Sequence, residues 1–142
     1  FKIAAARFPI VLGADDYTRR LHFHIEHVQL GLPIGVPAPN AQMSFIQSEQ
    51  AAAFLAWLGR SNLEGPVNAC SQGEITPGQI ITLITQATGR EANMLSETEA
   101  IHMSPFGVPE PWYMNTAKAE AAGFSFEPLQ DWMPELIRKI VG

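Results

Sequence analysis

The stretch PVNACSQGEITPGQIITLITQATG, residues 66–89, decides the class of the fold. Its first part, residues 66–71, is a short run that predicts a buried strand. The tetrapeptide Thr76-Pro77-Gly78-Gln79 holds a good N-cap, a proline suited to the first helical position and the glutamine that completes a capping box. Apolar residues then recur at helical spacing until Gly89 ends the helix. A short strand followed by a well-capped helix indicates an α/β fold.

Apolar runs and helical stripes continue to alternate on both sides of this stretch. Upstream, residues 1–12 predict a strand buried on both faces, interrupted near Pro9 because proline cannot donate to a strand ladder. Helices are expected at 17–30 and at 49–58, the second capped by Ser48, with a short strand at 33–36 between them. Downstream, residues 90–108 predict irregular structure, and Asn115 caps a short helix to residue 122. A last helix is expected after an Asp131 cap, since Pro134 suits only a first turn.

Length and composition place the chain among ordinary globular proteins. Its 142 residues suit one domain, 1–142, that is long enough to bury a core. No apolar run approaches the roughly 18 residues of a membrane span, and no signal peptide is visible, so no membrane partner is expected. Nine Lys and Arg against fourteen Asp and Glu give a net charge of −5 without basic clusters, which argues against nucleic acid. The single cysteine, Cys70, fits the reducing cytosol and hence a cytoplasmic protein.

The expected architecture is α/β with more helix than strand, and part of its sheet is missing. Two or three parallel strands are too few for a sheet that helices cover on both faces. Since the chain starts at Phe1 rather than Met, a fragment or a processed product is expected. The sequence holds no GxGxxG spacing, no Tyr-x-x-x-Lys, no GxSxG and no HExxH. These absences exclude the common phosphate-binding loops and catalytic motifs from this chain.

Three histidines form the one cluster that suggests a metal. His24 and His27 lie three residues apart on one face of the predicted helix, and His22 lies on another. Two imidazoles on one face could supply half of a metal site, or they could border the apolar stripe as half-exposed residues. No metal is expected, because the remaining ligands do not occur at the required spacings.

Other reactive side chains have both structural and functional interpretations. Cys70 could be a nucleophile or a small buried apolar residue, and a buried Arg7 would need a carboxylate or a ligand as its partner. Asp15 and Asp16 follow Gly13, where helix capping competes with an acid–base role. Residues 103–112, rich in proline and aromatic residues, could be a lid over an apolar ligand or a loop fastened by its aromatic side chains.

Four short motifs follow one another at distinctive spacing. They are RFPIVLG at 7–13, FIQSEQA at 45–51, PVNACS at 66–71 with EIT at 74–76 and ATG at 87–89, and NTAKAE at 115–120 with Gly123-Phe124. In this order they resemble the C-terminal, substrate-binding half of an extended short-chain dehydrogenase/reductase of the NAD-dependent epimerase/dehydratase family. The resemblance covers nearly the whole chain.

The resemblance implies a Rossmann-like fold without its Gly-rich nucleotide-binding half, which would lie upstream. The parent protein would be an NAD(P)-dependent oxidoreductase that transfers a hydride between nicotinamide and a carbonyl or alcohol. Its catalytic Ser/Thr and Tyr-x-x-x-Lys would also lie upstream, so this chain would contribute no catalytic residue. Alone it would be inactive and bind neither NAD nor NADP, and its partner would be the N-terminal Rossmann half. The alternative is a non-catalytic, cofactor-sensing regulator or binding module on the same scaffold.

The resemblance also assigns positions around the substrate. Phe8 and Pro9 would lie at the edge of the nicotinamide site, and the substrate side would include Ile10, Asp16, Tyr17, Met43 and Ser44. Sugar-nucleotide members often carry Arg-Asp where this chain has Met43-Ser44, and asparagine where it has Ile10. Because these apolar side chains cannot bind a phosphate or a sugar hydroxyl, a smaller or more apolar carbonyl or alcohol is expected instead of a sugar nucleotide.

The first predicted strand also suggests an association. Without neighbouring strands, its backbone groups would lack partners and its apolar face would be exposed. We therefore expect the fragment to self-associate, with a small-molecule substrate as its other partner.

Overall fold

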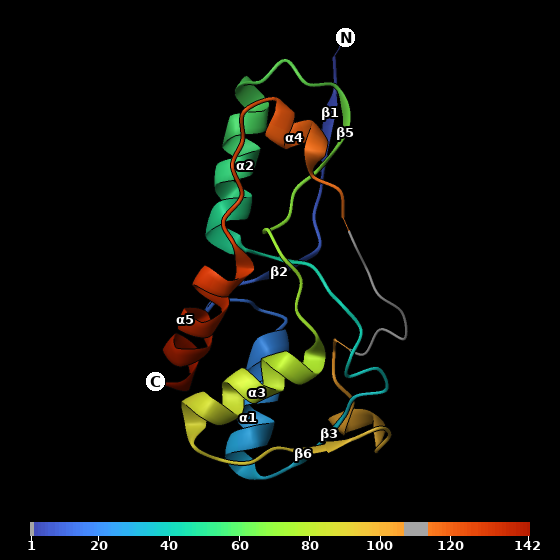
Figure 1. Cartoon of the computed structure of the whole chain (residues 1–142), viewed down its shortest axis with the longest axis vertical. Coiled ribbons are helices and arrows are strands. Elements are labelled where there is room, and N and C mark those ends of the chain that lie inside the picture. The colour runs from blue at the N-terminus through green and yellow to red at the C-terminus, as the bar shows by residue number, and fades with distance from the viewer. Residues whose placement is uncertain (1, 107–113) are drawn as a thin grey trace.

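The computed structural model describes residues 2–106 and 114–142, and within these ranges six short strands form three separate parallel pairs. The pairs are β1 (Ala4–Arg7) with β5 (Gly65–Asn68), β2 (Ile10–Leu12) with β4 (Phe45–Gln47), and β3 (Pro33–Gly35) with β6 (Asn93–Leu95). Figure 1 shows an elongated molecule in which these pairs follow one another along the long axis. The α/β class is confirmed, and the sheet is open and divided.

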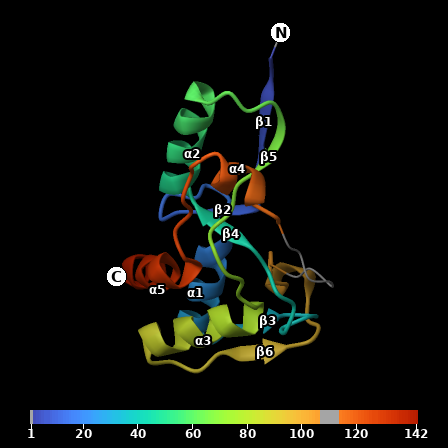
Figure 2. The ribbon, with the colours of Figure 1, turned by 45° about the horizontal axis from the view of Figure 1, so that its top comes forward.

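Five helices and one 3-10 turn accompany the strands. The helices are α1 (Arg20–Leu30), α2 (Ser48–Arg60), α3 (Pro77–Thr88), α4 (Ala117–Ala121) and α5 (Leu129–Val141), and the 3-10 turn is η1 (Ala100–His102). Helices α1, α3 and α5 contact one another at one end of the molecule, whereas α2 packs against β1 and α4 against β5 at the other (Figure 2). No helix of the described part is long and apolar enough to cross a membrane.

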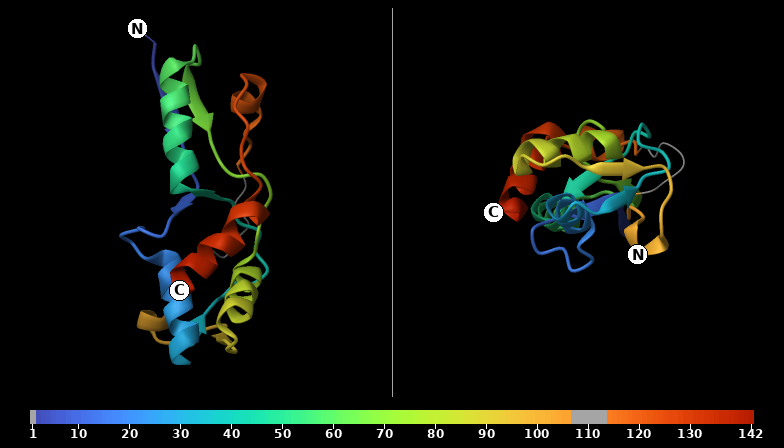
Figure 3. Two further views of the ribbon diagram at one scale, coloured as in Figure 1. Left: turned by 90° about the vertical axis from the view of Figure 1, so that its left-hand side faces the viewer. Right: turned by 90° about the horizontal axis from the view of Figure 1, so that it is seen from below.

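Two apolar clusters form the core, one at each end. The larger cluster lies among α1, α3 and α5 and includes Ile25, Ile80 and Met133. The smaller cluster lies between α2 and the β1–β5 pair, around the fully buried Phe54. Figure 3 shows the two helical groups at opposite ends, with the β2–β4 pair between them.

The capping box that the sequence predicts is present at the start of α3. The Gln79 backbone N–H donates to Thr76 Oγ1 over 3.0 Å, and the Thr76 N–H donates to Gln79 Oε1 over 2.9 Å. Gly89 ends the helix with φ of 69°, a conformation that glycine adopts without strain. The local signals of residues 76–89 are therefore confirmed.

The first apolar run differs from the expected strand. It is divided at Phe8-Pro9 into β1 and β2, which confirms the predicted interruption. Burial on both faces is wrong for β1, because its residues alternate between half-buried and exposed. Arg7 is exposed rather than buried, so it needs no internal carboxylate. Among the described strands β1 pairs with β5 alone, so its other edge has no partner strand, and the face that carries Ala5 and Arg7 is exposed.

Tertiary contacts shift the beginnings of several elements. The strand expected at 66–71 is β5, which ends at Asn68, and α2 takes Ser48 as its first residue instead of its cap. α5 begins at Leu129, before the expected Asp131 cap, and includes Pro134. The Leu129 N–H donates to the Gln72 carbonyl over 2.8 Å, a contact 57 residues apart in sequence that holds the first turn.

Two strands were not expected from the sequence. β4 directly precedes α2, and β6 lies within the stretch 90–108 that was expected to be irregular. Both have only three residues, which is too short for a periodic pattern. Each is defined by a partner far away in the chain, β2 or β3.

Candidate functional site

The β2–β4 pair brings some of the sequence-predicted site residues together. Ile10 lies opposite Phe45 in the register, so Ile10 and Ser44 are neighbours at the start of the pair. Pro9 is buried directly before β2, and the Phe8 ring meets the Phe54 ring edge-on, with centroids 6.1 Å apart. These residues therefore cluster at one end of the pair.

Met43 and Tyr17 have opposite environments. Met43 is 0% exposed, and its backbone exchanges hydrogen bonds of 2.9 and 3.0 Å with Ile75. Tyr17 is 92% exposed and follows the other end of β2, together with Asp16. Asp16 and Tyr17 are therefore separated from Ser44 by the length of β2.

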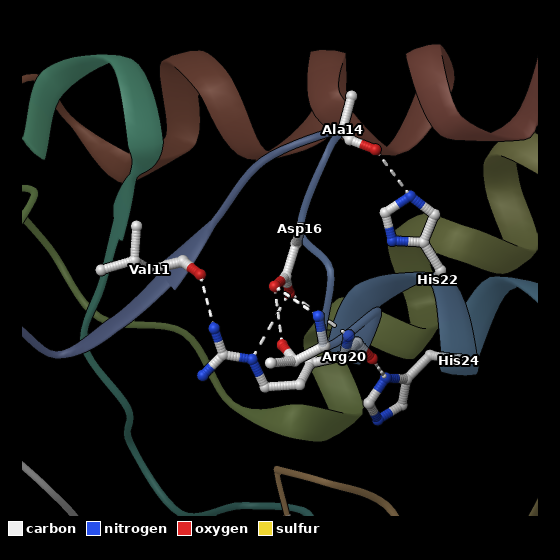
Figure 4. Close-up of polar contacts among 7 residues, drawn as sticks. Val11, Ala14, Asp16, Arg20, His22 and His24 are labelled. Atoms are coloured by element: carbon white, nitrogen blue, oxygen red, sulfur yellow. Dashed lines mark hydrogen bonds and ion pairs between the residues drawn. The ribbon is translucent and has the colours of Figure 1, made fainter. Parts of the chain in front are cut away.

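Asp16 holds the turn that leads into α1 (Figure 4). Its carboxylate accepts hydrogen bonds from the Thr18 hydroxyl over 2.6 Å and the Thr18 N–H over 3.1 Å, and it pairs with Arg20 Nε at 3.4 Å. The Arg20 guanidinium also donates to the Val11 carbonyl over 2.7 Å. This turn, with Arg19 at φ of 52°, delays the start of α1 to Arg20 instead of residue 17.

The same contacts set the charge of Asp16. Burial by itself would raise the pKa of the Asp16 carboxyl, but the hydrogen bonds from Thr18 and Arg20 and the Arg20 charge lower it below its ordinary value. An ionised carboxylate whose oxygens already accept several hydrogen bonds serves to cap and orient the turn.

The histidines are separated into different environments. His22 and His24 are buried, which corrects the half-exposed interpretation for these two, whereas His27 is half-buried. His22 Nε2 lies 2.9 Å from the Ala14 carbonyl oxygen (Figure 4). His27 Nε2 lies 3.1 Å from Nδ1 of His102. Within residues 2–106 and 114–142, no group of three or more His, Cys, Asp or Glu side chains could hold a metal ion.

His24 connects α1 to the segment after η1. Its Nδ1 lies 2.7 Å from the Arg20 carbonyl oxygen, and its Nε2 lies 2.6 Å from Ser104 Oγ. Its ring stacks on Phe106 with centroids 4.5 Å apart. Burial lowers the pKa of His24 to about 4, so a neutral imidazole fastens this segment. Of the segment 103–112, residues 107–112 lie outside the described residues.

Cys70 lies just after β5 and is 5% exposed. Burial raises the pKa of its thiol to about 11, while a hydrogen bond with Ser44 opposes this rise and the charges of Glu120 and Glu74 add to it. The thiolate is the nucleophilic form of cysteine, so this thiol is poorly suited to attack a substrate. The interpretation of Cys70 as a small buried residue fits this environment.

A polar pocket of about 690 Å³ lies beside Ser44 and Cys70, within the size range of small-molecule sites. Three segments line it: the residues that precede β4, those that follow β5, and those that lead into α4. Its polar groups include the side chains of Gln42, Gln72, Glu74, Asn115, Thr116 and Glu120. Of the predicted substrate residues, Ser44 alone is among the residues that line it.

Most of this pocket was missed by reasoning from the sequence. Asn115 was predicted to cap the helix and was part of a motif; the N-cap of α4 is instead Thr116, and Asn115 Oδ1 accepts a hydrogen bond from the Ala117 N–H over 2.9 Å. Nothing in the sequence placed that motif beside Ser44, which lies 71 residues earlier. The one sequence signal that pointed to this part of the pocket was the motif of residues 115–120, which follows the described strands and leads into α4.

Comparison with known proteins identifies the fold. No protein-family model matches the sequence, and no curated protein matches it significantly. UDP-N-acetylglucosamine 4-epimerase from Methanobrevibacter ruminantium, solved with UDP-N-acetylmuramic acid, is 17% identical with a TM-score of 0.75, covering 99% of this chain and 45% of its own. UDP-glucose 4-epimerase from Thermus thermophilus, solved with NAD, is 19% identical with a TM-score of 0.67 and coverages of 99% and 46%.

A third similar structure was solved with a different nicotinamide cofactor. RMD from Pseudomonas aeruginosa, solved with NADPH, is 15% identical with a TM-score of 0.72, covering 99% of this chain and 47% of its own. The chain thus spans about half the length of the solved structures it matches. Its fold is that of the C-terminal half of Rossmann-like, NAD-dependent epimerases, as the four sequence motifs predict.

Proposed function

We propose that this chain forms the substrate-binding half of an NAD(P)-dependent oxidoreductase or epimerase-type enzyme that acts on a carbonyl or alcohol. The observation that carries the proposal is the coverage: nearly the whole chain corresponds to slightly less than half of each similar structure. The two-stranded β1–β5 pair supports it, since parallel sheets normally have more strands and helices on both faces, whereas one face of β1 is exposed.

The residues of this chain would bind and orient the substrate. A nicotinamide cofactor, when bound, supplies or accepts the hydride, and its dinucleotide phosphates need a cradle that this sequence lacks. In the proposal, Phe8 and Pro9 border the nicotinamide, and Ile10 and Ser44 face the substrate. Met43, which is fully buried in the larger apolar cluster, contributes through packing rather than through contact with a ligand.

The first experiment compares two proteins, the 142-residue chain and the product of the longer reading frame that includes the coding sequence before Phe1. We expect no NADH oxidation and no NAD(P) binding by the chain alone, and both activities in the longer product. The upstream sequence is expected to encode a Gly-rich loop and Tyr-x-x-x-Lys. Turnover by the isolated chain would refute the proposal, and an upstream half with the loop but without the tyrosine would favour a cofactor-sensing regulator.

A pair of variants in the longer product tests the substrate side. Ser44→Ala removes a buried hydroxyl from the pocket and is expected to raise KM more than it lowers kcat. Thr82→Ala is the matched control, because Thr82 is an exposed hydroxyl on α3 outside this pocket. Equal kinetics for Ser44→Ala, Thr82→Ala and the parent would contradict the assignment of Ser44.

A further inference from the structure

The charges around the Ser44–Cys70 pocket have one sign. Glu74 and Glu120 are among the residues that line it, and none of its described lining residues is Lys or Arg. Among the described residues that line the pocket, a phosphate would therefore meet two carboxylates and no Lys or Arg.

Hydrogen bonds direct these groups and leave others for a ligand. The Thr116 hydroxyl donates to Glu120 Oε1 over 2.7 Å, which ties that carboxylate to the segment that lines the pocket. Ser71 Oγ accepts the Trp132 indole N–H over 2.8 Å and is committed to the core. Gln42 and Gln72 are exposed amides on the pocket wall, and such groups donate to and accept from hydroxyls.

The pKa of Cys70 is also affected by the negative charges that line the pocket. Burial is the main reason that the Cys70 thiol has a raised pKa, and the charges of Glu120 and Glu74 raise it further. Both carboxylates therefore act on Cys70, which is itself one of the residues that line the pocket.

We propose that this pocket takes a phosphate-free, hydroxyl-bearing amine, whose ammonium group pairs with Glu74 and Glu120 while its hydroxyls bind the neighbouring amides. The inference rests on the proposed function and specifies the substrate class of the same site. An ammonium group complements two carboxylates, and Ser44 and the glutamines suit a polar rather than an apolar body. The proposal differs from the smaller or more apolar carbonyl or alcohol that Ile10 and Met43 predict for the substrate.

Cys70 offers a direct test of the pocket charge in the intact protein. Two methanethiosulfonate reagents of similar size, one with an ammonium group and one with a sulfonate, would be reacted with the native protein and with the protein in urea. We expect the native protein to favour the cationic reagent about tenfold more than the unfolded chain does, which is the lower end of the effect of a cleft with charges of one sign. Glu120→Gln, which keeps the acceptor for Thr116, should lower this preference severalfold.

Glu91→Gln is the matched control, since Glu91 is an exposed carboxylate that does not line the pocket. It should leave the preference unchanged. Equal rates for the two reagents, or a faster reaction of the sulfonate reagent, would overturn the inference. The inference would also be overturned if Glu120→Gln and Glu91→Gln lowered the preference for the cationic reagent equally. The preference would then come from the net negative charge of the whole surface rather than from the pocket.

Binding of three sugars completes the test. Glucosamine, glucose and glucose 6-phosphate share one ring and differ in charge, and their binding would be followed through the amide signals of Ser44 and Asn115. The expected order of affinity is glucosamine, then glucose, then glucose 6-phosphate. Tightest binding of the phosphate would overturn the inference and leave the proposed function intact. Failure of the proposed function would instead be seen in the upstream sequence and in assays of hydride transfer. The thiol-reagent and sugar-binding experiments depend on neither of these.

Discussion

Removal of the Thr76 hydroxyl should destabilise the protein through the start of α3. Thr76 is buried, and its Oγ1 accepts the Gln79 N–H over 3.0 Å, one of the first four N–H groups that have no partner inside the helix. The residue before it, Ile75, is bonded to Met43, and Glu74 lines the candidate pocket. A weaker cap would therefore affect both the helix and the pocket wall.

The structure sets the size of the effect. Loss of an N-cap side chain costs about 0.5–2 kcal/mol, and the burial of Thr76 places Thr76→Ala near the upper value. Gln79→Ala loses one bond of 2.9 Å to the Thr76 N–H and should cost about 1 kcal/mol. Thr76→Ser keeps the hydroxyl and should recover most of the loss.

Urea unfolding followed by tryptophan fluorescence measures these values, with an unchanged m-value as the sign that only stability has changed. Thr82→Ala is the control, because the exposed Thr82 hydroxyl donates to the Gly78 carbonyl within the helix and does not cap it. If Thr76→Ala and Thr82→Ala cost the same, or if Thr76→Ser is as unstable as Thr76→Ala, the capping argument is refuted.

Three further predictions concern buried groups. Because the His24 pKa is lowered from 6.5 to about 4, the unfolded chain takes up a proton that the folded chain excludes, so stability should fall by at most about 3 kcal/mol between pH 6.5 and 4 in unfolding experiments at each pH. The pKa of Cys70 is raised from 9.0 to about 11, so its contribution to the free energy of unfolding is present below pH 9 and is lost as the pH rises to 11. Native Cys70 should also alkylate far more slowly at pH 8 than the unfolded chain in urea. Phe54→Ala should cost about 3–5 kcal/mol in the same unfolding assay, since Phe54 is fully buried among Phe8, Trp57, Phe124 and Phe126; a cost below that of Thr76→Ala would contradict this packing.

Elements with signals inside one short stretch were predicted well. The capping box, Gly89 and the stripe of α3 all lie within residues 76–89, and the break at Pro9 follows from one missing N–H. The four motifs led to the correct fold because their order records the arrangement of strands and helices along the chain.

Elements that depend on distant partners were not predicted. β4 and β6 are three residues long and exist through their pairing with β2 and β3. Arg7 was expected to be buried because its neighbours in the sequence are apolar. Apolar neighbours do not show which face of a strand is covered, and Arg7 is exposed. Pro134 was expected in a first turn, but the contact of Leu129 with Gln72 starts the helix earlier.

The amino-acid sequence was enough to establish the α/β class, the main helices and the absence of a phosphate-binding loop, since caps, stripes and loop motifs act over a few neighbouring residues. The tertiary structure alone decided which side chains meet. His24 bonds to Ser104 across 80 positions, Gln47 to Glu127 across 80, and Cys70 lies against Met114 across 44. The candidate pocket likewise joins three distant segments, so its charge and shape arise only when packing brings them together.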